Sequence, residues 1–384
     1  MFISASDTHL SETIYVGLPQ MRGDSYRSFA QICDHAVATQ ATALVLAGDV
    51  FDGQPSPLDV ECFLHNLGNL KRAKIKVYAI QGQHGHDEKL PWTSIDRYVI
   101  DLNNKVFEIE PGVFCAGFDT LPPNELQHEL SKLDPKVNLL VLHQMARYVF
   151  GERDGEQAWN FDPQWVPNTV KLVLLGDYHN PIQLTRGARD KCPMLYHGST
   201  CMQSIDEDPA KSFLEVKFER SMPLLDKPDA GQEKFIWKQI LLQTRPFQSH
   251  TIMTADALSA ARSCVEKAEP DSLVHIKYDP RVGTVESDLR KANDRCHFLF
   301  RLLPIKDVVD MPSIENLKDI SLETCLAAAV DPATDPEFYS FVLVLLQSKK
   351  PKETLEALKA KYLEVKHEPV QAGPQAVVQA NPVP

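Results

Sequence analysis

Long hydrophobic runs and an excess of positive charge are both missing from this chain of 384 residues. No apolar run approaches the length of a membrane span, and the first residues lack the basic and apolar regions of a signal peptide. We therefore expect a cytoplasmic protein without a membrane anchor. The net charge of −12 argues against a protein that holds nucleic acid by bulk positive charge. It does not exclude a nuclease, because bound divalent metals supply positive charge where phosphate binds.

Paired cysteines are also missing. The eight cysteines show no CxxC spacing, which argues against a zinc knuckle, and they suggest no disulfide framework. We expect them to be reduced and partly buried. The hydrophobic fraction of 43% and the charged fraction of 24% are typical of a globular protein. The length allows a sizeable core and more than one domain.

Apolar segments that stop abruptly at a glycine or a polar residue are the main pattern of the first half. The clearest example is the run 43–47, which ends at Gly48-Asp49. Four other segments end similarly, at Asp7-Thr8-His9, Gln81-Gly82-Gln83-His84, His143-Gln144 and Gly176-Asp177-Tyr178-His179. Buried parallel strands end in this way when they carry ligands to the edge of a sheet. One histidine after a strand is usually a hydrogen-bonded core residue, but five such ends favour a metal site.

Segments with helical period separate these strands, at 23–39, 58–70 and 125–133. The alternation predicts a layered α/β fold with right-handed crossovers. A segment with proline and glycine, 221–232, indicates a domain boundary. Beyond it, a β-α-β-α-β module is predicted, with strands at 235–242, 272–278 and 297–303 and helices at 254–268 and 285–293.

The last part of the chain contains only helical patterns, between residues 313 and 366. Its middle stretch, 335–348, carries Phe338, Phe341 and Leu345, and this apolar surface either packs on the other helices or docks on a partner. Residues 367–384, rich in Pro, Gln, Ala and Val with little charge, are expected to be disordered.

Hydrolysis of a phosphate ester by two metal ions requires the residue types found at these strand ends. A bridging carboxylate holds the two ions about 3.5–4 Å apart, and His, Asp and amide groups fill the remaining ligand positions. Mixed nitrogen and oxygen ligands favour Mn²⁺, Fe²⁺ or Zn²⁺ over Ca²⁺. The sequence therefore predicts a two-metal site.

The ordered motifs Asp7-x-His9, Gly48-Asp49, Gly82-Gln83-His84, His143 and Gly176-Asp177-Tyr178-His179 resemble the calcineurin-like metallophosphoesterase superfamily. Further motifs resemble its SbcD branch, the counterpart of the meiotic-recombination (MRE-type) DNA-repair nuclease. They are Asp49-Val50-Phe51-Asp52, Pro55-Ser56-Pro57, Tyr196-His197-Gly198-Ser199-Thr200 and Lys211-Ser212-Phe213. The resemblance implies a metallophosphoesterase β-sandwich flanked by helices over residues 1–220. It further implies a DNA-facing α/β cap domain over 232–310 and a helical ATPase-binding segment over 313–366.

The resemblance also implies roles for individual residues. The first metal would be held by Asp7, His9, Asp49 and His179, with Asp49 bridging, and the second would be completed by Gln83, His143 and Asp177. His84 would assist the leaving group, although His86 is an alternative that strand register disfavours. The family usually has Asn at the position of Gln83 and His at the position of Asp177, so the preferred metal is open.

The implied function is that of a Mn²⁺-dependent DNA nuclease subunit, with Mg²⁺ as a second candidate ion. Such a protein would act as a 3′→5′ exonuclease and single-strand endonuclease in DNA repair, recombination and replication. Its partners would be an SbcC-type coiled-coil ATPase and a second copy of itself, in a bacterial or phage-infected cell. Two alternatives stay open. One is a phosphoesterase acting on nucleotides or phosphoproteins, and the other is a metal-poor scaffold for the ATPase, supported only by Gln83 and Asp177.

Overall fold

The computed structural model describes residues 1–12, 21–83, 97–147, 149, 159–187, 190–220 and 233–303. The chain divides into two units, Met1–Pro304 and Ile305–Pro384. The predicted segments 313–366 and 367–384 lie outside the described residues, as do His84 and His86. Within the described ranges, no helix has both the length and the apolar character that crossing a membrane requires.

Six strands form the first sheet, in the order β12-β11-β1-β2-β3-β4. Their bounds are β1 Phe2–Ala5, β2 Ala43–Ala47, β3 Lys76–Ile80, β4 Val99–Asp101, β11 Ser212–Arg220 and β12 Glu233–Leu241. Strands β1 to β4 run parallel to one another. Strand β11 pairs antiparallel with β1, and β12 pairs antiparallel with β11. The carboxyl ends of β1, β2 and β3 therefore lie along one edge of this sheet.

The second sheet also has six strands, in the order β5-β6-β7-β8-β10-β9. Their bounds are β5 Lys105–Glu110, β6 Val113–Phe118, β7 Leu139–His143, β8 Leu172–Gly176, β9 Ile182–Gly187 and β10 Asp190–Tyr196. The four central strands are parallel, and the edge strands β5 and β9 are antiparallel to their neighbours.

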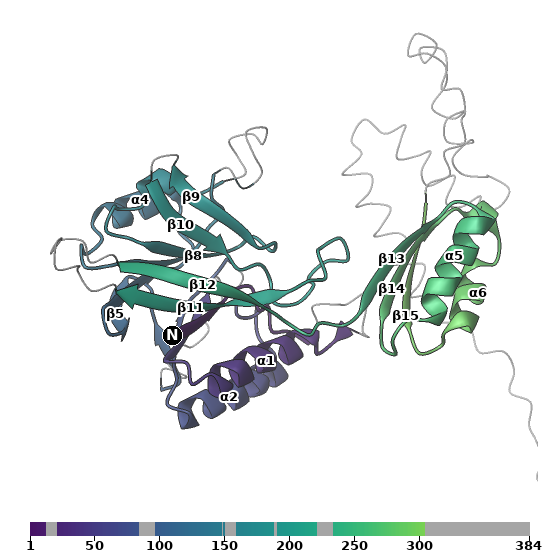
Figure 1. Ribbon diagram of the computed structural model, residues 1–384, viewed down its shortest axis with the longest axis horizontal. Coiled ribbons are helices and arrows are strands. Elements are labelled where there is room, and N and C mark those ends of the chain that lie inside the picture. The colour runs from purple at the N-terminus through teal and green to yellow at the C-terminus, as the bar shows by residue number, and fades with distance from the viewer. Residues whose placement is uncertain are drawn as a thin grey trace, which may run out of the picture. The chain divides into compact units, whose positions relative to one another are not determined.

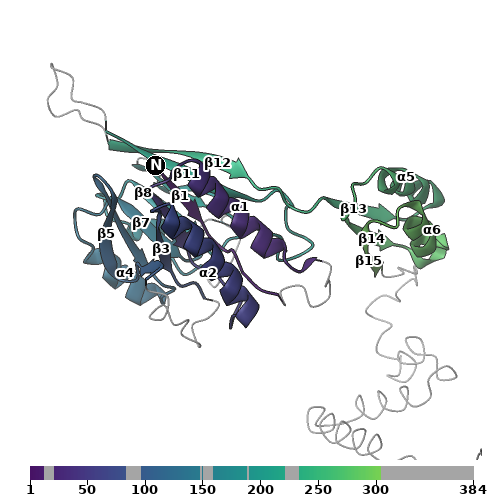
Figure 2. The same ribbon diagram turned by 90° about the horizontal axis from the view of Figure 1, so that it is seen from below.

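The two sheets pack face to face, with helices on their outer sides. Helices α1 (Asp24–Ala38) and α2 (Pro57–Arg72) lie side by side over the first sheet (Figure 2). Helix α4 (Pro123–Ser131) and a short 3₁₀ helix, η2 (Pro163–Trp165), accompany the second sheet. Helix α2 begins with a capping box, in which the Ser56 side chain accepts from the Asp59 N–H and Asp59 accepts from the Ser56 N–H. Such a cap stabilises the helix by about 0.5–2 kcal/mol.

Strand β2 shows why the apolar runs of the sequence are continuous. All five of its residues are fully buried. Leu44 and Leu46 contribute to the core under the helices, whereas Ala43, Val45 and Ala47 contribute to the core between the sheets. A strand covered on both faces does not show alternating polar residues. The layered β-sandwich flanked by helices that the sequence predicted is confirmed.

A third, smaller sheet follows, made of β13 (Phe247–Ile252), β14 (Leu273–Tyr278) and β15 (His297–Leu302), all parallel. Helices α5 (Ala255–Glu266) and α6 (Val285–Ala292) cover one face of it (Figure 1), and a 3₁₀ helix, η3 (Pro280–Val282), lies between β14 and α6. The predicted β-α-β-α-β arrangement is therefore present.

The first strand assigned to that module from the sequence was wrong. The strand predicted at 235–242 is β12, which pairs with β11 along nine residues of the first sheet. Strand β13, which the sequence analysis did not predict, takes its place. The predicted boundary at 221–232 thus separates two strands of one sheet, and the small domain begins after β12 rather than at residue 232. The physical reason is that Phe235 is buried in the core between the large sheets and the partly buried Trp237 packs against that core.

Candidate metal centre

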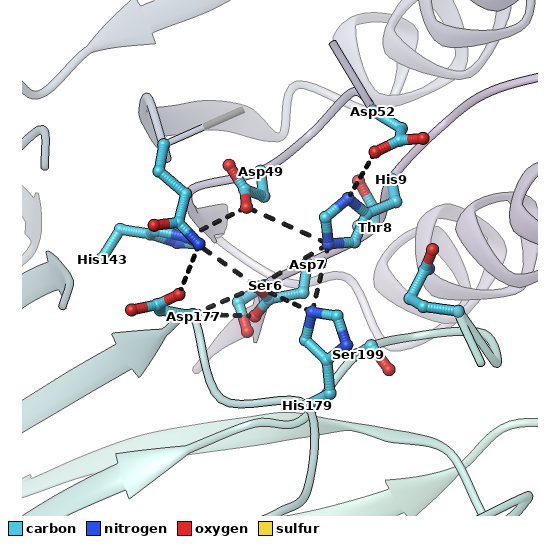
Figure 3. A network of polar contacts seen from close by, with 12 residues as sticks. Ser6, Asp7, Thr8, His9, Asp49, Asp52, His143, Asp177, His179 and Ser199 are labelled. Atoms are coloured by element: carbon cyan, nitrogen blue, oxygen red, sulfur yellow. Dashed lines mark hydrogen bonds and ion pairs between the residues drawn. The ribbon is translucent and has the colours of Figure 1, made fainter. Parts of the chain in front are cut away.

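The site is built where strand ends from both large sheets meet. Asp7 and His9 follow β1, Asp49 follows β2, and Gln83 follows β3 in the first sheet. In the second sheet His143 is the last residue of β7, and Asp177 and His179 follow β8. Figure 3 shows the side chains of Asp7, His9, Asp49, His143, Asp177 and His179 pointing toward one another. All seven metal ligands proposed from the sequence and described by the structure come together here.

Two groups of candidate ligand atoms can be distinguished within the described residues. The first contains Asp7, His9 and His179, and the second contains Asp7, Asp49 and His143. Within each group the ligand atoms lie within 4.8 Å of one another. The closest contact of the first group joins the Nε2 atoms of His9 and His179 at 3.3 Å. In the second group His143 Nε2 lies 3.1 Å from Asp49 Oδ2.

Two carboxylates lie between these groups. Asp49 is the residue proposed to bridge the ions. Its Oδ2 atom lies 3.1 Å from His143 Nε2 and 4.0 Å from His9 Nε2. Asp7 Oδ1 is also near all three imidazoles, 4.0 Å from His9, 3.9 Å from His143 and 3.8 Å from His179. Asp7 is therefore a second candidate for the shared ligand, which the sequence did not suggest.

Gln83 and Asp177, the two residues that differ from the family pattern, contact each other. Gln83 Nε2 donates a hydrogen bond to Asp177 Oδ1 at 2.8 Å. The Asp177 backbone N–H donates to the Asp7 carboxylate at 3.1 Å. The two departures thus lie together beside the cluster, linked to it through Asp7.

The imidazoles of His143 and His179 are each held at Nδ1 and face the cluster with Nε2. His143 Nδ1 lies 2.8 Å from the Ala47 carbonyl oxygen. Because a carbonyl only accepts, Nδ1 donates its proton to Ala47, and Nε2 is the nitrogen that a cation, either a proton or a metal ion, can take beside Asp49. That Nε2 atom is buried, and within the described part of the chain it makes no hydrogen bond of acceptable geometry, although Asp49 Oδ2 lies 3.1 Å away. A buried nitrogen lone pair beside carboxylates is the arrangement that a divalent cation satisfies.

Two glycines at the strand ends, Gly48 and Gly82, leave space for side chains of the site that come from other strands. A Cβ atom on Gly82 would lie 1.9 Å from Asp49 Oδ1, and one on Gly48 would lie 2.2 Å from His143 Nδ1. Glycine is required at both positions because the neighbouring side chains approach the backbone so closely.

The backbone at the site is strained at four of the residues proposed as ligands. Positive φ angles occur at Asp7 (49°), His9 (41°), Asp49 (45°) and Asp177 (88°). A non-glycine residue in this region costs about 1–3 kcal/mol and persists only where its surroundings hold it. Such strain clusters at functional sites, which agrees with a binding role for these strand ends.

The charge of the cluster also favours a cation. Burial lowers the pKa of the His143 imidazole, but the surrounding carboxylates, with Asp49 first, outweigh burial and raise that pKa to about 10. Burial and the nearby carboxylates raise the pKa of Asp177. Both directions show that the carboxylates need compensating positive charge. Imidazole nitrogens with carboxylate oxygens suit Mn²⁺, Fe²⁺ or Zn²⁺, so the residues present fit a two-metal centre.

Sequence reasoning missed Glu207, which hydrogen-bonds to the imidazole of the proposed ligand His179 at 2.9 Å. Burial raises the pKa of Glu207, but hydrogen bonds from His179 and from the buried Lys211 outweigh burial and lower it to about 2. Lys211 was part of a quoted motif, yet nothing in that motif indicated that its ammonium group reaches toward the site. No spacing rule connects Glu207 to a ligand 28 positions earlier.

Comparisons with known proteins show what this chain is similar to. The family described as calcineurin-like phosphoesterase matches residues 2–193, half of the chain. A protein named DNA double-strand break repair protein Mre11 from Methanosarcina acetivorans is 26% identical over 223 residues, covering 55% of this chain and 35% of the relative. A protein of the same name from Aeropyrum pernix is 35% identical over 202 residues, covering 47% and 49%. The matched segments thus span at most about half of these relatives. The solved structure of a dimetal phosphatase from Danio rerio is 11% identical, with a TM-score of 0.37, and covers 56% of this chain and 90% of that one.

Proposed function

Because the chain belongs to the calcineurin-like phosphoesterase family, we propose that it is a metal-dependent DNA nuclease that hydrolyses phosphodiester bonds. The observation that carries the proposal is the convergence of three imidazoles and two carboxylates at strand ends from both sheets. The similarity to proteins named Mre11 supports DNA as the substrate class. The proposed activities are those of a 3′→5′ exonuclease and single-strand endonuclease.

The proposed ligands divide into two sets. Asp7, His9, Asp49 and His179 would hold one ion, while Gln83, His143 and Asp177 would complete the other with Asp49. When bound, two divalent ions polarise the phosphodiester and make water a better nucleophile at neutral pH. Mn²⁺ is the proposed ion, with Mg²⁺ second, because Asp177 adds a hard carboxylate to the set.

The chain's own residues orient these groups. The Ala47 carbonyl accepts from His143 Nδ1 and thereby keeps Nε2 directed at the carboxylates. The Asp177 N–H and the Gln83 amide fix two carboxylates by hydrogen bonds. His84, which directly follows Gln83, is proposed to protonate or stabilise the leaving oxygen.

The test is release of nucleotides from end-labelled linear duplex DNA by the purified full chain, with Mn²⁺, Mg²⁺ or EDTA. The matched control is Asp49→Asn, which removes one carboxylate charge while preserving shape. We expect hydrolysis with Mn²⁺, loss with EDTA, and loss in the variant. Hydrolysis of small phosphate esters without hydrolysis of DNA would favour a general phosphoesterase. Failure of the wild-type protein to bind metal would favour a scaffold.

The proposed partners are an SbcC-type coiled-coil ATPase and a second copy of the chain. The small domain with β13, β14 and β15 is proposed to face DNA, as the family resemblance implies. Residues 313–366 are proposed to bind the ATPase, because stretch 335–348 carries an apolar surface in the sequence. Co-purification of the full chain with such an ATPase tests the partner proposal.

A further inference from the structure

Glu207 contacts the end of the His179 ring that points away from the metal cluster. Its Oε1 lies 2.9 Å from His179 Nδ1, whereas His179 Nε2 faces His9 and Asp7 at 3.3 and 3.8 Å. A carboxylate only accepts hydrogen bonds, so Nδ1 carries the proton and Nε2 keeps the lone pair that a metal requires. The contact thus sets both the tautomer and the direction of the ring.

The Glu207 carboxylate is itself fixed by three donors. Its Oε2 accepts from Lys211 Nζ at 2.8 Å, from the Gln203 N–H at 3.1 Å and from Ser199 Oγ at 3.3 Å. The Lys211 side chain is only 1% exposed, so this ion pair is shielded from water. All of these donors lie between β10 and the start of β11, and so does Glu207 itself.

The same segment also holds the backbone of His179. The Ser199 N–H donates to the His179 carbonyl at 3.1 Å, and Lys211 Nζ donates to Ser199 Oγ at 3.0 Å. A Cβ atom on Gly198 would lie 2.9 Å from that carbonyl oxygen, so the two backbones are in close contact. His179 is therefore fixed at its carbonyl and at its ring by one short stretch of chain.

The dependence of His179 on a side chain distinguishes it from His143. His143 is oriented by the Ala47 carbonyl, which no substitution removes. His179 is 29% exposed and oriented by a replaceable carboxylate. We infer that Glu207 is a positioning residue that holds His179 in the metal-binding orientation, and that Lys211 holds Glu207. This inference rests on the proposed function, because it assigns His179 a metal.

The experiment is a double-mutant cycle on the full chain with Glu207→Met, Lys211→Met and both together. Binding of Mn²⁺ alone is measured by electron paramagnetic resonance, and the melting temperature is measured on the metal-free proteins. Glu207→Met removes the carboxylate that pairs with the buried Lys211 ammonium, and Lys211→Met removes the cation that pairs with Glu207. Either single variant should lower the melting temperature, whereas the double variant should recover much of it. Metal affinity, unlike the melting temperature, should not recover in the double variant.

We expect both variants that lack Glu207 to bind one Mn²⁺ about 10–100-fold more weakly than the wild type. Affinity for the other ion should stay within a few-fold. Lys211→Met should retain most of the affinity, because Glu207 still contacts His179 and keeps two other donors. Glu219→Met removes an exposed carboxylate of β11 and controls for net charge.

Two results would overturn the inference alone: unchanged Mn²⁺ affinity in Glu207→Met, or affinity that recovers with the melting temperature in the double variant. In the second case Glu207 would contribute only to stability. Absence of Mn²⁺ binding by the wild-type chain would overturn the proposed function, and the inference with it.

Discussion

At the scale of single residues, Gly82 contributes no functional group, yet the space beside it determines where Asp49 lies. Because a Cβ atom there would overlap Asp49 Oδ1 at 1.9 Å, Gly82→Ala should displace that ligand. If this displacement removes several kcal/mol of charge stabilisation, the hydrolysis rate of the variant should fall by about 10²–10³-fold. The matched substitution is Gly68→Ala in α2, where the nearest atom is 3.7 Å away.

Gly68→Ala should instead raise the free energy of unfolding by about 0.5–1 kcal/mol and leave the rate unchanged. Initial rates on labelled DNA and the Mn²⁺ content of both proteins provide the comparison. Equal rates in the two alanine variants would mean that the position of Asp49 does not limit hydrolysis.

His84 is proposed to act on the leaving group and not to hold a metal. Its replacement by alanine should therefore lower the rate by about 10²–10⁴-fold while the metal content stays that of the wild type. His86→Ala is the comparison, because His86 is the alternative candidate, and it should have a small effect. If His86→Ala lowers the hydrolysis rate more than His84→Ala does, His86 is the residue that acts on the leaving group. Loss of metal from His84→Ala would identify His84 as a ligand.

Asp177 should determine which ion is used. Its carboxylate accepts from Gln83, and its backbone N–H contacts Asp7, so it lies beside the other ligands. Carboxylate is a hard ligand that suits Mn²⁺ and Mg²⁺, whereas imidazole suits Zn²⁺ and later transition metals. Asp177→His should shift activity from Mn²⁺ toward the softer ions without loss of the folded state. The readout is the hydrolysis rate of both proteins across a metal panel, and identical profiles would exclude Asp177 as a ligand.

At the scale of elements, the strands that carry the proposed ligands were predictable and the order of the strands was not. An apolar run ending at glycine, as at Gly48 and Gly176, is typical of a strand covered on both faces, and β2 and β8 have that burial. The partner of β12 could not be predicted, because alternating Phe235 and Trp237 suit an edge strand of any sheet. Glu207 could not be predicted either, since its function depends on tertiary contacts and not on local pattern.

Another tertiary contact joins the two large sheets at His197, directly after β10. His197 Nδ1 lies 2.9 Å from the Leu175 carbonyl in β8, and Nε2 lies 2.7 Å from Ser4 Oγ in β1. Because the carbonyl only accepts, Nδ1 donates to it and Nε2 accepts from the Ser4 hydroxyl. Burial lowers the pKa of His197 from 6.5 to about 4, so this histidine is neutral and structural.

This shift gives the free energy of unfolding a dependence on pH. The folded pKa lies below the unfolded one, so the contribution is complete above about pH 6.5 and is lost as the pH falls toward 4. The contribution of His197 to the free energy of unfolding is at most about 3 kcal/mol. His197→Gln should be less stable at pH 7 but show a flatter decline between pH 6.5 and 4. Denaturant unfolding of the metal-free proteins tests this, with the exposed His65→Gln in α2 as control. Parallel curves for wild type and His197→Gln would contradict the assignment.

At the scale of the whole molecule, the net charge of −12 and a DNA substrate are compatible because positive charge is needed only locally. Carboxylates of the site contribute to the negative total, and divalent ions reverse the sign of the charge where phosphate would bind. We therefore expect the metal centre, and not the overall surface, to dominate the interaction with the scissile phosphate.

The division of the chain into Met1–Pro304 and Ile305–Pro384 leads to the last prediction. Every described residue proposed as a ligand, together with Glu207, lies in the first unit, so a chain ending at Pro304 should keep Mn²⁺ affinity and metal-dependent hydrolysis close to those of the full chain. The same truncation removes the apolar residues Phe338 and Leu345, so it should abolish co-purification with an SbcC-type ATPase. The full chain carrying Phe338→Ala and Leu345→Ala is the matched variant, and should bind the ATPase more weakly at an unchanged basal rate. If the truncated chain still co-purifies with the ATPase, the partner surface must lie within the first 304 residues, because only those residues remain.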